Sequence, residues 1–346
     1  MKKHPNILFP AEWYPQGAIL LTWPHAHTDW QPLLPEVIPC YVRIAQEILR
    51  REKLMIVCAS IPEVTAALGA SANDTRILFR EIPSNDTWAR DHGPVSVYIQ
   101  GRPAVLDFGF NGWGLKFPAH LDNQITRRLY QSGVFDPAVE YCSFREIVLE
   151  GGSLESDGQG TILTTARCLL SPNRNEYGDT AEAEEYLKIL LGARQVLWLH
   201  HGDLAGDDTD SHIDTLARFC DPETIAYVRC TDENDEHFAE LSRMEKELQS
   251  FRTAKGKPYR LLPLPMAEAV YDAGERLPAT YANFLIINGA VLMPTYRSPL
   301  DEQAKAALQT AFPGREIVGV DCLPLIKQHG SLHCVTMQIP HEFIAK

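Results

Sequence analysis

Five carboxylates and a histidine crowd into one stretch near the middle of the chain, GDLAGDDTDSHIDTLARF, residues 202–219. Because like charges repel, such crowding needs a metal ion, a bound organic cation or a solvated loop to be stable. The stretch lacks the Asp and Gly spacing of a calcium loop and the HExxH spacing of a zinc helix. His212 and Asp214 stand two residues apart, so an extended backbone would point both side chains to one face.

Two further segments combine aromatic residues with glycine. In NDTWARDHGPVSV, residues 85–97, the Trp and the second Asp would suit a pocket for a cation, because an aromatic face attracts positive charge. A turn with a buried Trp and a surface Arg90–Asp91 pair is the simpler interpretation. In DFGFNGWG, residues 107–114, the glycines would let a ligand approach the backbone, but a tight aromatic turn explains the pattern equally.

The last two segments contain a carboxylate and a thiol. Glu150 ends an apolar run and precedes two glycines in LEGGSLESDGQGTILTT, residues 149–165, which also fits a plain hairpin with exposed acids. Cys334 lies between a glycine turn and an apolar strand in HGSLHCVTMQIP, residues 329–340. At such a junction a cysteine can be exposed and electropositive enough to react as thiolate, with His212 as its partner in space. A small buried residue is the alternative.

Apolar periodicity predicts five helices, each among several short strands. The helices are expected at 36–51, 119–132, 179–191, 236–252 and 299–311. The strands are expected at 54–59, 76–82, 94–99, 145–149, 161–165, 194–199, 225–229, 283–288, 291–294, 315–320 and 334–339. Asp179 with Glu182 predicts a capped helix start, and Gly192 predicts its end. The later helices recur roughly every 60 residues, which indicates a repeated unit, although an ordinary open α/β sheet is the alternative.

Composition narrows the function classes. The 346 residues are 45% hydrophobic, enough for one large domain or two ordinary ones. A net charge of −13 disfavours nucleic acid as a partner, and the sequence has no GxGxxG or GxxxxGK[ST] fingerprint. The N-terminus has no apolar signal region, and no apolar run is long enough to cross a membrane. Eight cysteines without a CxxC pair predict reduced thiols and a cytoplasmic protein.

Together these segments resemble the agmatine deiminase branch of the guanidine-modifying (pentein) superfamily, which also contains the bacterial peptidylarginine deiminases. The matching pieces are WARDHGP, FGFNGWG, LEGGSLESDGQGT, DDTDSHIDTLARF and GSLHCVTMQIP, and they occur in the family's order. The opening EWYPQGAILLTWP is similar to the family's N-terminal segment. The resemblance implies a five-bladed, pseudo-symmetric α/β propeller of ββαβ-type units, with residues 1–346 as a single catalytic domain.

The resemblance also implies a buried, negatively charged site for a guanidinium group, with neither a metal nor an organic cofactor. By resemblance, Asp91 and Asp214 bind the guanidinium N–H groups, Cys334 attacks the carbon and His212 is the general acid/base. Trp88, Glu150 and Asp208 would line the pocket.

The expected reaction is deimination of agmatine, a small cationic guanidine, to N-carbamoylputrescine and ammonia through a covalent thiouronium intermediate. It would belong to putrescine and polyamine metabolism, in a homo-oligomer that we expect to be a dimer. One alternative is a deiminase of peptidyl or free arginine that produces citrulline. Another is a non-enzymatic or metal-binding protein that uses the acidic loop 207–214. Free arginine carries a carboxylate that favours a nearby Arg, whereas agmatine needs none.

Overall fold

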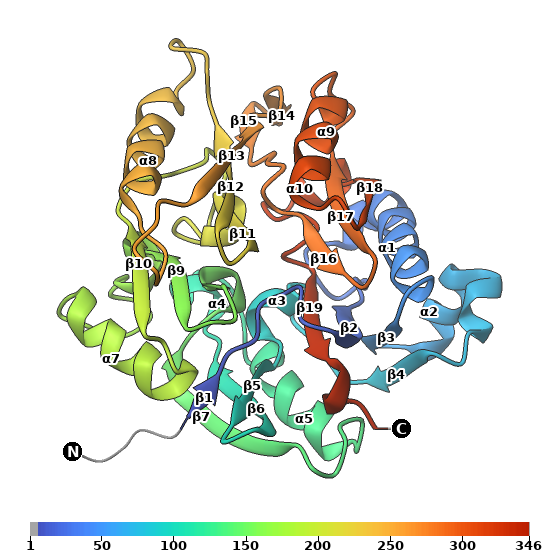
Figure 1. Ribbon diagram of the computed structural model, residues 1–346. Coiled ribbons are helices and arrows are strands. Elements are labelled where there is room, and N and C mark those ends of the chain that lie inside the picture. Colours follow the sequence, from blue (N-terminus) through green and yellow to red (C-terminus); the bar gives the residue numbers. More distant parts are fainter. Residues whose placement is uncertain (1–5, 346) are drawn as a thin grey trace.

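The computed structural model describes residues 6–345, and the strands in that range form six sheets flanked by helices (Figure 1). Five sheets have three or four strands. The sixth is a small hairpin of β14 (Val270–Asp272) and β15 (Glu275–Leu277). The open-sheet alternative is therefore wrong, because the strands do not join into one continuous sheet.

Each of the five larger sheets is built on the same ββαβ unit, in which an antiparallel pair is followed by a helix and a parallel third strand. Four units follow one another along the chain. They are β5 (Val95–Ile99), β6 (Arg102–Gly109), α5 (Ile125–Gln131) and β7 (Glu140–Val148); β8 (Glu155–Ser156), β9 (Thr161–Thr165), α7 (Thr180–Leu191) and β10 (Gln195–Leu199); β11 (Ala217–Asp221), β12 (Thr224–Arg229), α8 (Phe238–Ser250) and β13 (Arg260–Pro265); and β16 (Leu285–Ile287), β17 (Ala290–Thr295), α9 (Asp301–Ala311) and β18 (Glu316–Asp321).

The remaining unit joins the two ends of the chain. The last strand, β19 (Thr336–Pro340), pairs antiparallel with β2 (Gln16–Thr22). From β2 the chain continues through α1 (Leu34–Leu49) to the parallel strand β3 (Lys53–Cys58), and through α2 (Ile61–Leu68) to β4 (Ile77–Glu81). The short β1 (Ile7–Leu8) extends the sheet of β5. This closure brings the residues before β19, including Cys334, next to the N-terminal segment.

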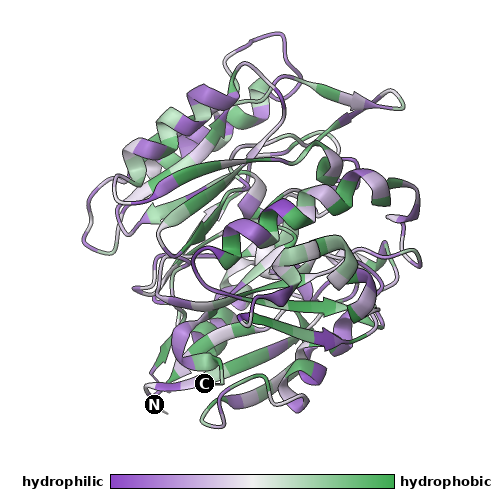
Figure 2. Cartoon of the chain, turned by 90° about the vertical axis from the view of Figure 1, so that its right-hand side faces the viewer, coloured by the Kyte–Doolittle hydropathy of each residue, from purple (hydrophilic) through white to green (hydrophobic). Residues whose placement is uncertain are grey.

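The longer helices α1, α2, α5, α7, α8 and α9 lie at the periphery and the strands lie inward of them, whereas the short α3 (Ala89–His92) and α4 (Gly112–Leu115) lie near the middle (Figure 1). Each peripheral helix buries one apolar stripe. In α1, Val37, Tyr41, Ile44 and Ile48 recur every three or four residues and are fully buried. Figure 2 shows the same division, with hydrophobic residues along the strands and hydrophilic residues on the outer faces of helices. Burial of these stripes fixes the strands, and the strand ends carry the loops described below.

The five predicted helices are confirmed, with one shortened. The predicted helix 119–132 begins as an α-helix only at Ile125, after a short 3-10 turn. Asp179 caps α7 by accepting from the Glu182 amide, and Gly192 ends it in the left-handed region. The predicted strands all coincide with observed ones, although β7 begins at Glu140 and β19 only at Thr336. The strands that the sequence did not predict are β1, β2, β6, β8, β11, β13, β14 and β15. No helix in the described range is long and apolar enough to span a bilayer.

Candidate active site

A cavity of about 110 Å³ brings four of the predicted residues together: Trp88, Asp91, Asp208 and Cys334. Its other lining residues are Asp29, Asp86, Trp113, Phe117, Thr209, Gln328, His329 and Gly330. Gly330 lies flat against the Trp88 ring, since a Cβ at that position would come within 2.2 Å of Trp88. The Trp88 side chain is only 5% exposed, so the aromatic part of the predicted cation pocket is present.

Of the three other predicted residues, His212 and Asp214 meet Asp91 at Gly152, and Glu150 lies behind His212, with its Oε2 3.7 Å from Nε2 of the ring. A Cβ on Gly152 would stand 2.6 Å from Nδ1 of His212, 2.8 Å from Oδ1 of Asp91 and 3.2 Å from Oδ2 of Asp214. Only glycine fits where these three groups converge. The glycine pair after Glu150 therefore has a steric function, and the interpretation of this segment as a plain hairpin with exposed acids is wrong, because Glu150 is fully buried.

Asp91 lies on the short helix α3 (Ala89–His92) and is held by two neutral donors. Nε1 of Trp113 donates to Oδ2 at 2.9 Å, and the Gly152 amide donates to Oδ1 at 2.9 Å. Burial raises the pKa of Asp91 to about 6, although the nearby His212 opposes this. Arg90 and Asp91 are both buried, so the alternative of a surface ion pair is wrong.

Trp113 reaches Asp91 because its backbone adopts an unusual shape. Trp113, Gly114 and Leu115 all have positive φ angles, of 56°, 84° and 69°. A non-glycine residue rarely adopts this region, and the Asn111 side chain stabilises the turn by accepting from the Gly114 amide. The aromatic-glycine segment therefore serves to aim one indole N–H at the site.

His212 lies between two carboxylates. Its Nδ1 is 3.6 Å from Oδ1 of Asp91, and its Nε2 is 3.7 Å from Oε2 of Glu150. Neither ring nitrogen has a hydrogen-bond partner among the described residues. Burial lowers the pKa of His212, but the charge of Asp91, together with the polar contacts of the ring with Cys168 and Glu150, outweighs burial and holds this pKa well above its usual value. The ring is thus an imidazolium that can give up a proton.

Glu150 is fixed by an arginine that the sequence reading did not single out. Nε of Arg174 donates to both oxygens of Glu150, at 3.0 and 2.8 Å, and Nη1 of Arg174 donates to Asp210 at 2.5 Å. Burial raises the pKa of Glu150, but His212 and Arg174 outweigh it, so the pKa is lowered and the carboxylate stays charged.

Asp214 is also fixed by a residue outside the predicted set. Its Oδ2 is 2.8 Å from Nδ1 of His333, whereas its Oδ1 is buried without a partner in the described chain. Burial raises the pKa of Asp214, but His333 outweighs it and the pKa is lowered. The prediction that His212 and Asp214 share a strand face is wrong: residues Ile213–Thr215 form a 3-10 turn, and it is this turn that brings both side chains to Gly152.

Cys334 lies at the predicted junction before β19, but it is neither exposed nor in electropositive surroundings. Its Sγ lies 3.4 Å from Oδ1 of Asn283 and 3.8 Å from Oδ2 of Asp214, and the residue is only 5% exposed. Burial raises the pKa of this thiol well above its usual value, and the charges of Asp214 and Asp91 raise it further. A positive charge in the cavity would reverse this effect.

The acidic loop is structured by its own side chains. Asp207 accepts from Ser211 N and Thr209 Oγ1, and Asp210 pairs with Lys116 and Arg174. Asp208 faces the cavity, and burial raises its pKa. The solvated-loop alternative therefore explains little of this segment.

Two groups of buried side chains within residues 6–345 have the spacing of metal ligands: Glu150, Cys168 and His212, and Glu12, Glu155 and His333. In each group an arginine is already ion-paired with the carboxylates. Arg174 binds Glu150, and Arg218 binds Glu12 and Glu155. These guanidinium groups would repel a divalent cation, so the residues do not fit a metal site. The acids of the 207–210 loop belong to neither group.

The missed residues differ in how visible they are in the sequence. Glu12 stands in the EWYPQGAILLTWP segment and His333 directly precedes Cys334, so both were within quoted motifs. Arg174 and Asn283 carry no local signal, because only tertiary contacts bring them to the site.

The comparisons with known proteins agree with this geometry. The family model described as Porphyromonas-type peptidyl-arginine deiminase matches residues 8–340, and the chain belongs to this family. The agmatine deiminase of Pseudomonas aeruginosa is 32% identical, over 96% of this chain and 95% of its own.

Two solved structures are similar over almost their whole length. One is described as the "Putative Arginine Deiminase from Porphyromonas gingivalis", with 57% identity, a TM-score of 0.94 and coverage of 98% of this chain and 100% of its own. The other is a Cys-to-Ser variant of C. jejuni agmatine deiminase with substrate bound, with 35% identity, a TM-score of 0.90 and coverage of 98% and 97%. The fold is thus the α/β fold of the pentein superfamily.

Proposed function

We propose that the protein hydrolyses the guanidinium group of agmatine to N-carbamoylputrescine and ammonia. The observation that carries this proposal is the charge of the cavity. Its lining includes Asp29, Asp86, Asp91 and Asp208, and none of the described residues that line it is Arg or Lys. A substrate with positive charge at both ends fits this lining, whereas the carboxylate of free arginine would lack a cationic partner.

In the proposed mechanism Asp91 and Asp214 hold the guanidinium from two sides. They come from different sheets, one from the helix before β5 and the other from the turn before β11. The unpartnered Oδ1 of Asp214 accepts one N–H group, and Asp91 accepts others, while Trp88 covers the cation. This arrangement fixes the planar group against Cys334 and supplies orientation.

The bound cation also activates the nucleophile. Because burial and two carboxylates keep the Cys334 thiol protonated, a guanidinium beside it favours the thiolate, and the thiol proton passes to solvent as the cation enters. The thiolate then attacks the guanidinium carbon to give a tetrahedral adduct. His212 donates its proton to the leaving nitrogen, and ammonia departs to leave a thiouronium linked to Cys334.

The second half of the reaction reuses the same groups. His212, now neutral, takes a proton from water as the water attacks the thiouronium carbon. The second tetrahedral adduct collapses, the carbon–sulfur bond breaks, and the ureido product leaves with the thiolate restored. Glu150, held by Arg174, keeps His212 oriented and charged between turnovers.

The architecture belongs to the same proposal. We propose that the five ββαβ sheets are the blades of a propeller with a pseudo-fivefold axis, and that residues 1–346 form a single catalytic domain. A dimeric state, a cytoplasmic location and a role in putrescine formation stay predictions.

A deiminase of arginine is the second candidate, favoured by the description of the relative that is 57% identical. The test is to measure ammonia and ureido product from agmatine, free arginine and a blocked peptidylarginine side by side. We expect agmatine to give the highest kcat/KM. A higher kcat/KM for either arginine substrate would overturn the assignment of agmatine while leaving the deimination chemistry in place.

A further inference from the structure

A histidine that the mechanism above does not use lies in the middle of a buried chain of charges. His333 is 1% exposed, and its two ring nitrogens face two different carboxylates. Nδ1 lies 2.8 Å from Oδ2 of Asp214, and Nε2 lies 2.6 Å from Oε2 of Glu12. The backbone of His333 is fixed as well, because its amide donates to Oδ1 of Asn283 at 2.8 Å.

We propose that His333 is a positioning residue for Asp214, and that Glu12 orients His333 for this task. His333 binds one oxygen of Asp214, which leaves the other oxygen, Oδ1, buried and free for a guanidinium N–H group. The inference rests on the proposed function, because it assigns Asp214 to the substrate.

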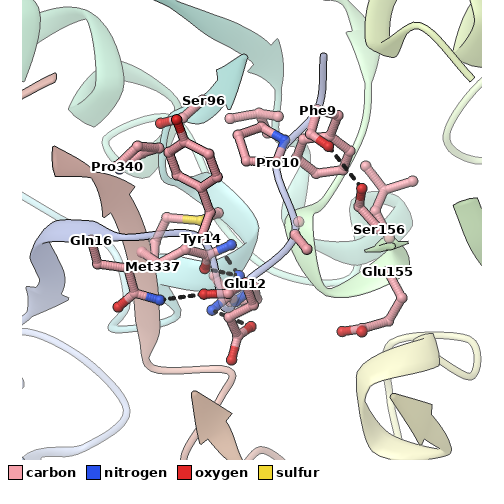
Figure 3. Close-up of a pocket in the computed structure, with 16 residues that line it drawn as sticks. Phe9, Pro10, Glu12, Tyr14, Gln16, Ser96, Glu155, Ser156, Met337 and Pro340 are labelled. Carbon is pink, nitrogen blue, oxygen red and sulfur yellow. Dashed lines mark hydrogen bonds and ion pairs between the residues drawn. The ribbon is translucent and has the colours of Figure 1, made fainter. Parts of the chain in front are cut away.

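Glu12 is suited to anchor this chain because it is itself held from several sides. Its Oε2 accepts from Nη2 of Arg218 at 2.8 Å, and its Oε1 accepts from the Ile286 amide at 2.6 Å. Glu12 lines a second cavity, shown in Figure 3, whose lining shares no residue with the candidate active site. The hydrogen bonds from Glu12 through His333 to Asp214 therefore link the N-terminal segment to the candidate active site, on the side away from the cavity.

The chain makes a prediction about pH that a packing role would not make. His333 lowers the pKa of Asp214 against the effect of burial, so removal of the imidazole should raise that pKa. With burial then largely unopposed, as it is at Asp91, we expect Asp214 to titrate in the same pH range as Asp91, and the acid side of the kcat/KM profile to move to higher pH. The other charged or titratable groups that influence Asp214 are Asp91 on α3, His212 on the same turn, Arg218 on β11, Arg90 on α3 and Cys334 before β19. They stay in place, so the shift reports His333.

Two substitutions separate the two bonds of His333. In His333→Asn the amide nitrogen takes the place of Nδ1 and can still donate to Asp214. In His333→Gln it takes the place of Nε2 and can donate only to Glu12. We expect His333→Gln to lower kcat/KM by about 10- to 100-fold, the effect of losing one hydrogen bond to a charged group. His333→Asn should lose much less, and both variants should show the acid side moved to higher pH.

The assays use whichever guanidine substrate the unsubstituted protein turns over fastest. If another guanidine is turned over faster than agmatine, only the proposed function is contradicted. The relative loss of kcat/KM in His333→Gln and His333→Asn, measured with that other substrate, still tests the role of His333. His200→Gln, at an exposed position, is the matched control and should leave kcat/KM and the pH profile unchanged. Thermal unfolding identifies the temperature range in which each variant is folded.

Equal losses in both variants, with an unmoved pH profile, would overturn the positioning role and leave His333 as a packing residue. If His333→Gln does not fold, His333→Asn alone decides through its pH profile: a shift to higher pH supports the proposal, and no shift overturns it.

Discussion

Replacement of Asp91 by Asn is the sharpest test of the guanidinium site, because it keeps the shape of the side chain and removes its charge. Both oxygens of Asp91 accept from fixed donors, Trp113 Nε1 and the Gly152 amide. The amide of Asn has only one acceptor oxygen, so its NH₂ group must face one of these donors. The substitution thus removes a charge and one hydrogen bond together.

The size of the effect follows from the burial of Asp91. One pKa unit corresponds to about 1.4 kcal/mol, so a pKa of about 6 in place of 3.8 means that the ionised form is disfavoured by about 3 kcal/mol. A guanidinium at about 4 Å supplies about 4 kcal/mol at an effective dielectric constant of about 20, which restores the charged form. Asp91→Asn loses this attraction, offset in part by the easier burial of an amide. We expect kcat/KM to fall at least about 100-fold, or about 2.7 kcal/mol.

The pH profile gives a second readout for the same variant. Activity requires ionised Asp91, so the kcat/KM of the unsubstituted protein should fall as the pH drops through about 6. Activity also requires protonated His212, whose pKa is raised by Asp91, so Asp91→Asn should move the alkaline side of the profile to lower pH. Initial rates of ammonia release across the pH range measure both effects.

Asp210→Asn is the matched comparison, because Asp210 lies in the acidic loop but pairs with Lys116 and Arg174 and does not line the cavity. Arg174 keeps its two bonds to Glu150 in this variant, so we expect a loss below about 10-fold, as for a partly exposed ion pair. If the two variants lost activity equally while their circular dichroism spectra matched that of the native protein, the assignment of Asp91 to the substrate would be refuted.

Three further predictions concern the same site. Cys334→Ser should abolish turnover and leave the thermal unfolding midpoint nearly unchanged, because a hydroxyl is a far weaker nucleophile; a rate near that of the native protein would remove Cys334 from the mechanism. Dialysis against a chelator should leave kcat unchanged, since an arginine is already ion-paired with the carboxylates of both candidate ligand groups; a loss that divalent metal restores would favour the metal-binding alternative. Trp113→Phe should lower kcat/KM by about 10-fold through loss of the hydrogen bond to Asp91, whereas an unchanged value would show that the Gly152 amide alone positions the carboxylate.

The regular parts of the fold could be predicted from the sequence because their apolar patterns are local. The stripe of α1 and the cap and stop of α7 at Asp179 and Gly192 are visible in a few consecutive residues. The strand β2 was not predicted, since its buried run GAILLT does not alternate between apolar and polar residues. The strand β6 was not predicted either; it follows β5 across a turn of only two residues. The pairing of β19 with β2 lies beyond any local pattern, because it joins residues over 300 positions apart.

The site shows a similar limit. Residue types and motif order predicted side chains that the structure brings together around one cavity, but they did not predict the surroundings of these side chains. The segment around Cys334 fitted either an exposed, electropositive thiol or a small buried residue, and Cys334 is buried beside Asp214. His212 and Asp214 were expected on one strand face, but Asp214 lies on a 3-10 turn that begins directly after His212. Neither point could be decided from the local sequence, since burial and turn geometry depend on chain segments that pack from elsewhere.

The carboxylates that gather around the candidate active site differ in how their charge is balanced. Glu150 has Arg174 as its fixed partner, Glu12 has Arg218, and Asp214 has His333 on one oxygen. The pKa values of these three are all lowered by those partners against the effect of burial. Asp91 instead has two neutral donors and a histidine 3.6 Å away, and its pKa is raised to about 6. Asp91 and the free oxygen of Asp214 are thus the negative charge that the described residues leave without a full counterion. Under the proposed function, we expect a planar cation that enters the cavity to complete this charge balance and to lower the pKa of the thiol in the same step, so that the site would become reactive only when a substrate of the right charge is bound.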